Sequence, residues 1–217
     1  RGSKLTDVVV LVVAADDGVK PQTIESIKHA KAANVPIVVA INKCDLPEAD
    51  PMKVKNQLLE HELIAEELSG DTLMVEISTK TKQNLSKLVE SIILQSELLD
   101  LKADYNVKAN AVVLESKVDI GRGPIANIII TNGTLKKGDY FVSGLRWGKV
   151  RAIINDLGQN IQEAYPASPV EVLGINGASK SGDDFVVLEN EKEAKSLCDA
   201  RIEESKIGKN PITFATQ

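Results

Sequence analysis

The pattern of apolar and polar residues divides the chain into two parts, and the first part alternates between strands and helices. Residues 7–15 are apolar without alternation after the initial Asp, which is typical of a strand buried on both faces of a parallel sheet. Apolar residues at helical spacing follow Pro21 and Pro51 and fill residues 84–99. The expected strands are residues 7–15, 36–41 and 72–77. Right-handed crossovers between them predict an α/β unit over residues 1–100, with helices on both faces of a parallel sheet.

The second part consists of short β-type runs separated by glycine-bearing turns. Residues 101–106 are the expected linker, and residues 107–190 predict a small antiparallel β-barrel. The Thr-Asn-Gly-Thr turn at 131–134 is typical of a hairpin. Residues 191–217 carry many charges and few large apolar side chains, so we expect an exposed helix followed by a tail. The expected barrel strands are residues 107–118, 125–131, 139–143, 149–155, 170–175 and 184–189.

The first strand would lie at the edge of its sheet, where a long bare apolar strand is an aggregation hazard. We therefore expect sheet-forming chain before Arg1, or a partner that covers residues 8–13.

Composition narrows the class of protein. The chain has 217 residues, of which 43% are hydrophobic and 26% charged, as in soluble globular proteins. A net charge of −5 argues against a general nucleic-acid binder, although a local basic patch remains compatible with it. Two cysteines, Cys44 and Cys198, make no disulfide framework and favour a reducing compartment. No apolar run reaches the roughly 18 residues that span a bilayer, so we expect no membrane partner.

Two polar loops follow neighbouring strands of the predicted sheet. Residues 42–45 read Asn-Lys-Cys-Asp after the second strand, and residues 78–80 read Ser-Thr-Lys after the third. Ligands bind at the carboxyl ends of strands in such sheets, so both loops are expected to serve one site. An ordinary strand-to-helix turn is the alternative for each loop taken alone.

The residue types in these loops fit a guanine base. The Asp45 carboxylate can accept from both N1–H and the 2-amino group, a pair of donors that adenine does not offer. Asn42 would bind the base edge and tie the loop to its neighbours, while the backbone N–H of Thr79 would reach the guanine oxygen. The aliphatic stems of the two lysines would lie on the ring faces. The predicted guanine-binding residues are Asn42, Lys43, Asp45, Ser78, Thr79 and Lys80.

An ordered series of segments resembles a known family. Residues 14–25 read Ala-Ala-Asp-Asp-Gly-Val-Lys-Pro-Gln-Thr-Ile-Glu, and the loops at 42–45 and 78–80 and a Gly-Arg-Gly-Pro turn at 121–124 follow in order. The series closely resembles the bacterial and organellar translation initiation factor 2 family of translational GTPases. Its Asp-Gly-Val-x-Pro-Gln-Thr segment distinguishes it from the elongation factors and from the cytosolic eukaryotic counterpart. Thr79 departs from the alanine usual in the family, with little effect expected because the backbone acts there.

The resemblance implies that residues 1–100 are the C-terminal half of a Ras-like G domain and that an elongation-factor-like barrel follows. Family members bind GTP or GDP with Mg²⁺, place initiator tRNA on the small ribosomal subunit and promote subunit joining with GTP hydrolysis. The barrel would contact RNA of the small subunit, and a region beyond Gln217 would bind initiator tRNA. We expect a monomer.

The parts that hold phosphates are absent from this sequence. No Gly-x-x-x-x-Gly-Lys-[Ser/Thr] occurs in it. The family's switch threonine and its Asp-x-Pro-Gly-His segment, which orders Mg²⁺ and the attacking water, are also missing. Phosphoryl transfer depends on these groups, so no catalytic residue is predicted within the chain. The alternative to a GTPase is a non-hydrolysing module that binds ribosomal RNA and keeps a vestigial guanine loop.

Basic residues gather in sequence around the turns of the predicted barrel, together with Lys117 and Trp147. They suit contact with an RNA backbone, and a solvated basic face is the alternative. The candidate RNA contacts are Arg122, Lys136, Lys137, Arg146, Lys149 and Arg151.

Two other sequence patterns give little support for a dinucleotide site or a metal site. Residues 121–126 match a dinucleotide fingerprint in letters, but a strand follows where a helix is needed. His29 and His61 lie on separate predicted helices without matching ligands, so no metal site is expected. A Lys-, Asn- and Ile-rich drift from the family's bacterial pattern favours the mitochondrial matrix, with the bacterial cytoplasm as the alternative.

Overall fold

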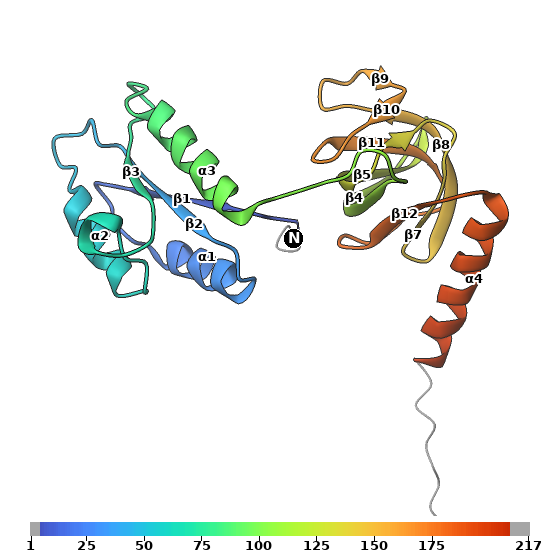
Figure 1. Ribbon diagram of the computed structural model, residues 1–217, viewed down its shortest axis with the longest axis horizontal. Helices are drawn as coiled ribbons and strands as arrows, with labels where there is room; N and C mark the ends of the chain where they lie inside the picture. The colour runs from blue at the N-terminus through green and yellow to red at the C-terminus, as the bar shows by residue number, and fades with distance from the viewer. Residues whose placement is uncertain (1–4, 209–217) are drawn as a thin grey trace, which may run out of the picture. The chain divides into compact units, whose positions relative to one another are not determined.

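A computed structural model describes residues 5–208 of the chain, which form two compact units. One unit comprises Thr6–Leu101 and the other begins at Lys102. Each unit is described by itself below, with the element labels of Figure 1.

The first unit is a parallel sheet with helices on both faces, as predicted. Its strands pair in the order β1 (Val9–Ala14), β2 (Ile37–Asn42) and β3 (Met74–Glu76). Its helices are α1 (Pro21–Ala32), α2 (Pro51–Leu59), the short 3-10 helix η1 (Glu66–Leu68) and α3 (Leu85–Leu99). Helices α1 and α2 contribute buried side chains to the core beside β1 and β2, and α3 covers the opposite side of the sheet (Figure 1).

The central strand β2 is the most buried element of this unit, with Val38 to Ile41 fully enclosed. The first strand differs from the prediction that both of its faces are buried. Leu11 and Val13 face the core, whereas Val10 and Val12 are 38% and 58% exposed. Val10 and Val12 are exposed because β1 lies at the edge of the sheet among the described residues, while α3 packs on β2 and β3.

The second unit is a closed antiparallel barrel, as predicted. The sheet runs in the order β11-β5-β4-β12-β7-β8, and pairing of β11 with β8 closes it. Phe141 and Phe185 stack in its core with ring centroids 4.3 Å apart. The strands of this unit are β4 (Asn110–Asp119), β5 (Gly123–Asn132), β6 (Leu135–Lys136), β7 (Tyr140–Ser143), β8 (Arg146–Ile154), β9 (Asn160–Ile161), β10 (Glu163–Ala164), β11 (Pro169–Ile175) and β12 (Asp184–Leu188).

The turn at 131–134 does not form the hairpin that its sequence predicts. Strand β6 pairs with β10 and not with β5. Gly133 adopts a left-handed φ of +76°, and a Cβ there would lie 2.4 Å from the carbonyl oxygen of Lys108. The turn therefore serves a close approach of two backbones.

Helix α4 (Glu191–Ile207) was predicted to be exposed, which is wrong for one of its sides. Ala194 and Cys198 are buried against β7 and β8. Arg201 forms a bidentate ion pair with Asp184, with N–O distances of 2.9 and 2.7 Å. The small buried residues let the helix approach the barrel closely. The predicted tail at 209–217 lies outside the described residues.

Within residues 5–208, no helix has the length and apolar character needed to cross a membrane.

Candidate functional site

The two loops predicted to form one site do lie at the same edge of the sheet. Strands β2 and β3 are parallel neighbours, so their carboxyl ends point the same way. Beyond the strands the pairing continues, because the Ile77 N–H donates to the Ile41 carbonyl at 2.7 Å and the Cys44 N–H donates to the Ile77 carbonyl at 3.1 Å. The backbone thus holds the loop after β2 against the loop after β3.

Asn42 and Thr79 join the two loops through side chains. The Thr79 backbone N–H donates to Asn42 Oδ1 at 3.1 Å, and Asn42 Nδ2 donates to Thr79 Oγ1 at 3.3 Å. Asn42 therefore ties the loops together, in the geometry that the sequence suggested. The same bond engages the N–H that was predicted to reach the guanine oxygen, so that role requires Thr79 to share its donor.

Ser78 orients the carboxylate of Asp45. Ser78 is fully buried, and its hydroxyl donates to Asp45 Oδ1 at 2.7 Å while accepting from the Thr81 N–H at 3.1 Å. One carboxylate oxygen is thereby fixed, which sets the direction of the other. Ser78 acts as a positioning residue in this arrangement, since it contacts Asp45 and lies beneath the surface.

We expect Ser78→Ala to lower the free energy of unfolding by about 1–3 kcal/mol, because two hydrogen bonds at a buried site are lost. Urea unfolding of both proteins measures the difference. Ser26→Ala is the control, because the Ser26 hydroxyl is exposed and bonds only its own helix at Gln22 among the described contacts. Equal stability of the Ser78 and Ser26 variants would contradict the role given to Ser78.

Lys43 has a charged partner in the loop that follows β1. Its backbone is left-handed, with φ of 63°, and its Nζ lies 3.2 Å from Asp16 Oδ2. Partial burial by itself would raise the pKa of the Asp16 carboxyl, but the hydrogen bond from Lys43 and backbone donors outweigh it and lower that pKa. The parallel register places Ala14 beside Asn42, so the loop after β1, which carries Asp16, lies next to the loop after β2, which carries Lys43. Lys80 is exposed at the same edge.

A buried cation that the sequence pattern did not reveal connects α2 to the end of β3. Lys55 of α2 is 2% exposed, and its Nζ lies 2.9 Å from Glu67 and 3.0 Å from Glu76. Burial alone would lower the pKa of Lys55, but the hydrogen bonds and charges of both glutamates raise it. Glu76 ends β3, one residue before Ile77, so this ion triad anchors the strand that presents Ser78.

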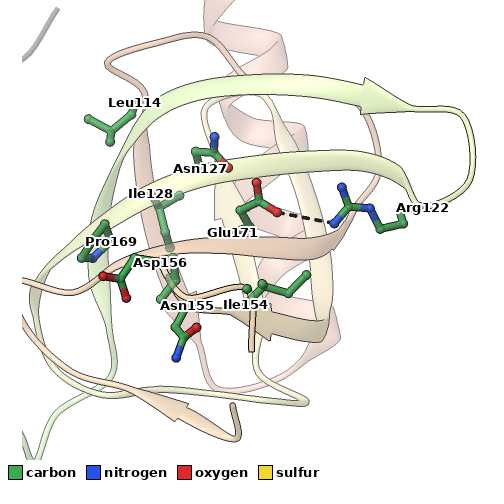
Figure 2. A pocket seen from close by; sticks show the side chains of 11 residues that line it. Leu114, Arg122, Asn127, Ile128, Ile154, Asn155, Asp156, Pro169 and Glu171 are labelled. Atoms are coloured by element: carbon green, nitrogen blue, oxygen red, sulfur yellow. Dashed lines mark ion pairs between the residues drawn. The ribbon is translucent and has the colours of Figure 1, made fainter. Parts of the chain in front are cut away.

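The candidate RNA contacts have different neighbours on the barrel, although Arg122 and Arg151 lie together. Arg122 and Lys117 both approach Glu171, with N–O distances of 3.5 and 3.4 Å (Figure 2 shows Arg122). Lys136 instead lies 3.7 Å from Glu163. The other candidates differ again: Arg151 donates to the Arg122 carbonyl, Lys149 lies over the Tyr140 ring, and Lys137, Arg146 and Lys149 have solvent-accessible side chains.

Both units match known protein families. Residues 1–97 match the family described as elongation factor Tu GTP binding domain, and residues 108–188 match elongation factor G domain 2. Over all 217 residues the chain is 76% identical to translation initiation factor IF-2 of Pelagibacter ubique, and over 201 residues it is 56% identical to that of Cereibacter sphaeroides. The chain belongs to the translation initiation factor IF-2 family. It spans 30% and 24% of the length of these two relatives.

Two solved structures share the fold of this chain. GDP-bound aIF5B from Aeropyrum pernix matches with a TM-score of 0.77 at 25% identity, over 93% of this chain and 42% of that one. Elongation factor SelB from Methanococcus maripaludis, at 22% identity and a TM-score of 0.68, shares the fold over 87% of this chain and 41% of that one. The IF-2 relatives named above are bacterial, so the predicted mitochondrial origin finds no support among them.

Proposed function

We propose that this chain is the guanine-selecting and RNA-contacting part of a translation initiation factor that binds and hydrolyses GTP. One observation supports the proposal: at adjacent parallel strand ends, Ser78 is bonded to Asp45 and Thr79 is bonded to Asn42, so the polar groups suited to a guanine base lie at one edge of the sheet. The names of the relatives supply the process, translation initiation.

Each residue then has a chemical role. Asp45 accepts the two adjacent donors of guanine with its two carboxylate oxygens, one of which also accepts from the Ser78 hydroxyl. Asn42 keeps the two loops at a fixed spacing and borders the base. The stems of Lys43 and Lys80 cover the ring faces. Sites built from such polar partners reject a base that leaves them unpaired by roughly 10⁴–10⁵-fold.

The phosphates and Mg²⁺ need groups from outside residues 1–217. Among residues 5–208, no cluster of three or more His, Cys, Asp or Glu side chains could hold a metal ion. When bound, Mg²⁺ neutralises charge on the phosphates during transfer. This chain's own contribution is recognition of the base.

The 217-residue chain alone is expected to bind GTP and GDP more weakly than micromolar and to release no phosphate from GTP. The reason is that phosphate and Mg²⁺ contacts supply much of the binding and nearly all of the catalysis. Titration calorimetry with GDP, and a phosphate-release assay, measure both. Micromolar or tighter affinity of this chain for GDP would refute the proposal that the phosphate contacts come from outside residues 1–217. If the full-length protein also failed to hydrolyse GTP, the alternative of a non-hydrolysing module would be favoured.

We expect replacement of Arg122, Lys136 and Lys137 with Ala to weaken binding to the small ribosomal subunit. Each lost phosphate contact should reduce the slope of log affinity against log salt by about one. Sedimentation of the subunit with each protein at several salt concentrations measures this. Lys28, Lys53 and Lys87, exposed on the other unit, are the charge-matched control. Equal salt slopes for both triple variants would remove the barrel as the RNA-binding surface.

We further propose that initiator tRNA binds segments outside this chain. The protein acts as a monomer, and its compartment is the bacterial cytoplasm. The bacterial relatives support that compartment. Sedimentation velocity of the full-length protein tests the monomer.

A further inference from the structure

The loop after β1 is bonded to the elements on both sides of the candidate guanine site. The Ala15 N–H donates to the carbonyl of Asn42, the last residue of β2, at 2.8 Å. The Ala15 carbonyl accepts from the N–H of Asp50, the N-cap of α2, at 3.0 Å. Further along the loop, the Val19 N–H donates to Gln57 Oε1 of α2 at 2.9 Å. The loop therefore has a fixed position at the strand edge that carries the site.

Glycine at position 18 lets this loop lie close to α2. Gly18 has a left-handed φ of +75°, and a Cβ there would lie 2.4 Å from Gln57 Oε1. Its N–H donates to the Ala14 carbonyl at 2.9 Å, which closes a tight turn over residues 14–18. The turn that presents Asp16 is thus held by its own backbone as well as by α2.

Lys43 is held at both ends of its side chain. Its left-handed backbone, with φ of 63°, is a conformation that persists in a residue other than glycine only where the surroundings hold it. The Cys44 N–H donates to the Ile77 carbonyl at 3.1 Å, and the Leu46 N–H donates to the Lys43 carbonyl at 3.2 Å. At the other end, Lys43 Nζ lies 3.2 Å from Asp16 Oδ2. The aliphatic stem therefore spans from the loop after β2 to the loop after β1.

Asp16 is the better fixed partner of this ion pair. Its side chain is 19% exposed, whereas that of Lys43 is 46% exposed. Asp16 Oδ1 accepts from the Asp17 N–H at 3.0 Å, which leaves Oδ2 for the ammonium. A long side chain with this exposure and no tether samples many rotamers, and a ligand has to immobilise it on binding. The Asp16 carboxylate immobilises Lys43 before a ligand arrives.

We infer that Asp16 is a positioning residue for the guanine site, because it holds the Lys43 ammonium so that the aliphatic stem is ready to cover one face of the base. Asp16 acts through Lys43 and does not touch the ligand. The inference rests on the proposed guanine-binding function and gives the loop after β1 a task in it. Covering a ring face does not depend on the groups at the ring edge. Asp16 therefore affects the affinity for related purine diphosphates equally, and Asp45 decides among them.

The test uses a full-length chimera in which these 217 residues replace the matching segment of the Pelagibacter ubique relative. Competition against a fluorescent GDP analogue gives the affinities for GDP and for inosine diphosphate, which lacks the 2-amino group. Asp16→Asn should weaken both about three- to tenfold, as expected when binding must immobilise one more long side chain. The ratio of the two affinities should stay the same. Asp16→Glu keeps the carboxylate and should recover most of the lost affinity.

A double-mutant cycle shows whether Asp16 acts through Lys43. Lys43→Met keeps an unbranched, flexible stem but removes the ammonium. In that background Asp16→Asn should cause no further loss of GDP affinity, whereas independent effects would add. Asp17→Asn is the matched control, because Asp17 lies in the same loop, is 56% exposed and pairs with Lys20 at 3.6 Å. It should leave both affinities unchanged. Thermal unfolding confirms that each variant is folded.

Unchanged GDP affinity in Asp16→Asn, or an equal loss with and without the Lys43 ammonium, would overturn the inference. Tighter binding would overturn it too, since the carboxylate would then repel the phosphates of the ligand. A changed ratio of GDP to inosine diphosphate affinity, or an equal loss in Asp16→Glu, would also count against it. Asp45→Asn is measured in parallel. If neither Asp45→Asn nor Asp16→Asn lowers GDP affinity, the proposed guanine site fails, whereas a loss in Asp45→Asn alone removes only the role of Asp16.

Discussion

Asp45→Asn is expected to change the preferred base from guanine to xanthine. Ser78 donates to Asp45 Oδ1, and an asparagine at this position keeps that acceptor because only its oxygen can receive the hydroxyl proton. The amide nitrogen must then face the base. Guanine presents donors there, so two donors oppose each other, whereas xanthine presents a carbonyl oxygen at the position of the amino group. The hydrogen bond from Ser78 thus dictates the direction of the change.

The expected loss of GDP affinity is on the order of 10³-fold or more, since the site's polar groups are left unpaired. Because this chain lacks the phosphate-binding groups, the measurement belongs in a full-length chimera in which these 217 residues replace the matching segment of the Pelagibacter ubique relative. Competition with GDP and xanthosine diphosphate gives the two affinities. Adding Ser78→Ala frees the amide to rotate and should narrow the preference for xanthine. Unchanged GDP affinity in Asp45→Asn would exclude this loop as the base-recognition site.

The second large effect concerns the ion triad. Changing Glu67 and Glu76 together to Gln is expected to lower the free energy of unfolding by about 3–5 kcal/mol at neutral pH, because it leaves the Lys55 ammonium buried without a counter-ion. Urea unfolding at pH 7 measures the loss. The matched control changes Glu60 and Glu66, which are exposed in the same unit and should have little effect. A difference below that of the control pair would show that the triad contributes nothing.

The pH dependence of unfolding gives an independent check. The pKa of Lys55 is raised above its ordinary 10.5: burial opposes the charge, but Glu67 and Glu76 outweigh burial. The stabilisation is therefore fully present below 10.5 and is lost as pH rises through the folded-state value. In the double Gln variant burial dominates and the folded-state pKa falls below that of the unfolded chain, so stability should rise with pH. The slope of unfolding free energy against pH should thus have opposite signs in the two proteins near pH 10.5.

The sequence predicted the elements that position the site better than the contacts that hold it. Apolar runs located β1, β2 and β3, and parallel topology alone required the loops at 42–45 and 78–80 to meet. The hairpin expected at 131–134 shows where such reasoning fails. Local turn chemistry does not reveal that β6 pairs with β10, because that partner lies in a distant part of the chain.

The basic residues of the barrel make the same point. In sequence they form one group, yet the structure pairs Arg122 with Glu171 and Lys136 with Glu163. All of them face outward, but they come from different strands and turns around the barrel, so nearness in sequence does not give nearness in space. The exposed helix and tail predicted at 191–217 also depended on composition, yet Ala194 and Cys198 are buried and pack α4 against the barrel with Leu197 and Ile202.

By itself, the sequence determined the α/β unit, the barrel and the set of residues suited to guanine. These follow from local patterns, since a strand's carboxyl end and the residues after it are adjacent along the chain. Only the tertiary structure decided the partners: Asp16 for Lys43, Glu76 for Lys55 and Glu171 for Lys117, which are 27, 21 and 54 positions apart. Charged residues have many possible partners in sequence, and only the folded chain selects among them. The same selection leaves Asn127 Oδ1 buried and without a partner among the described residues.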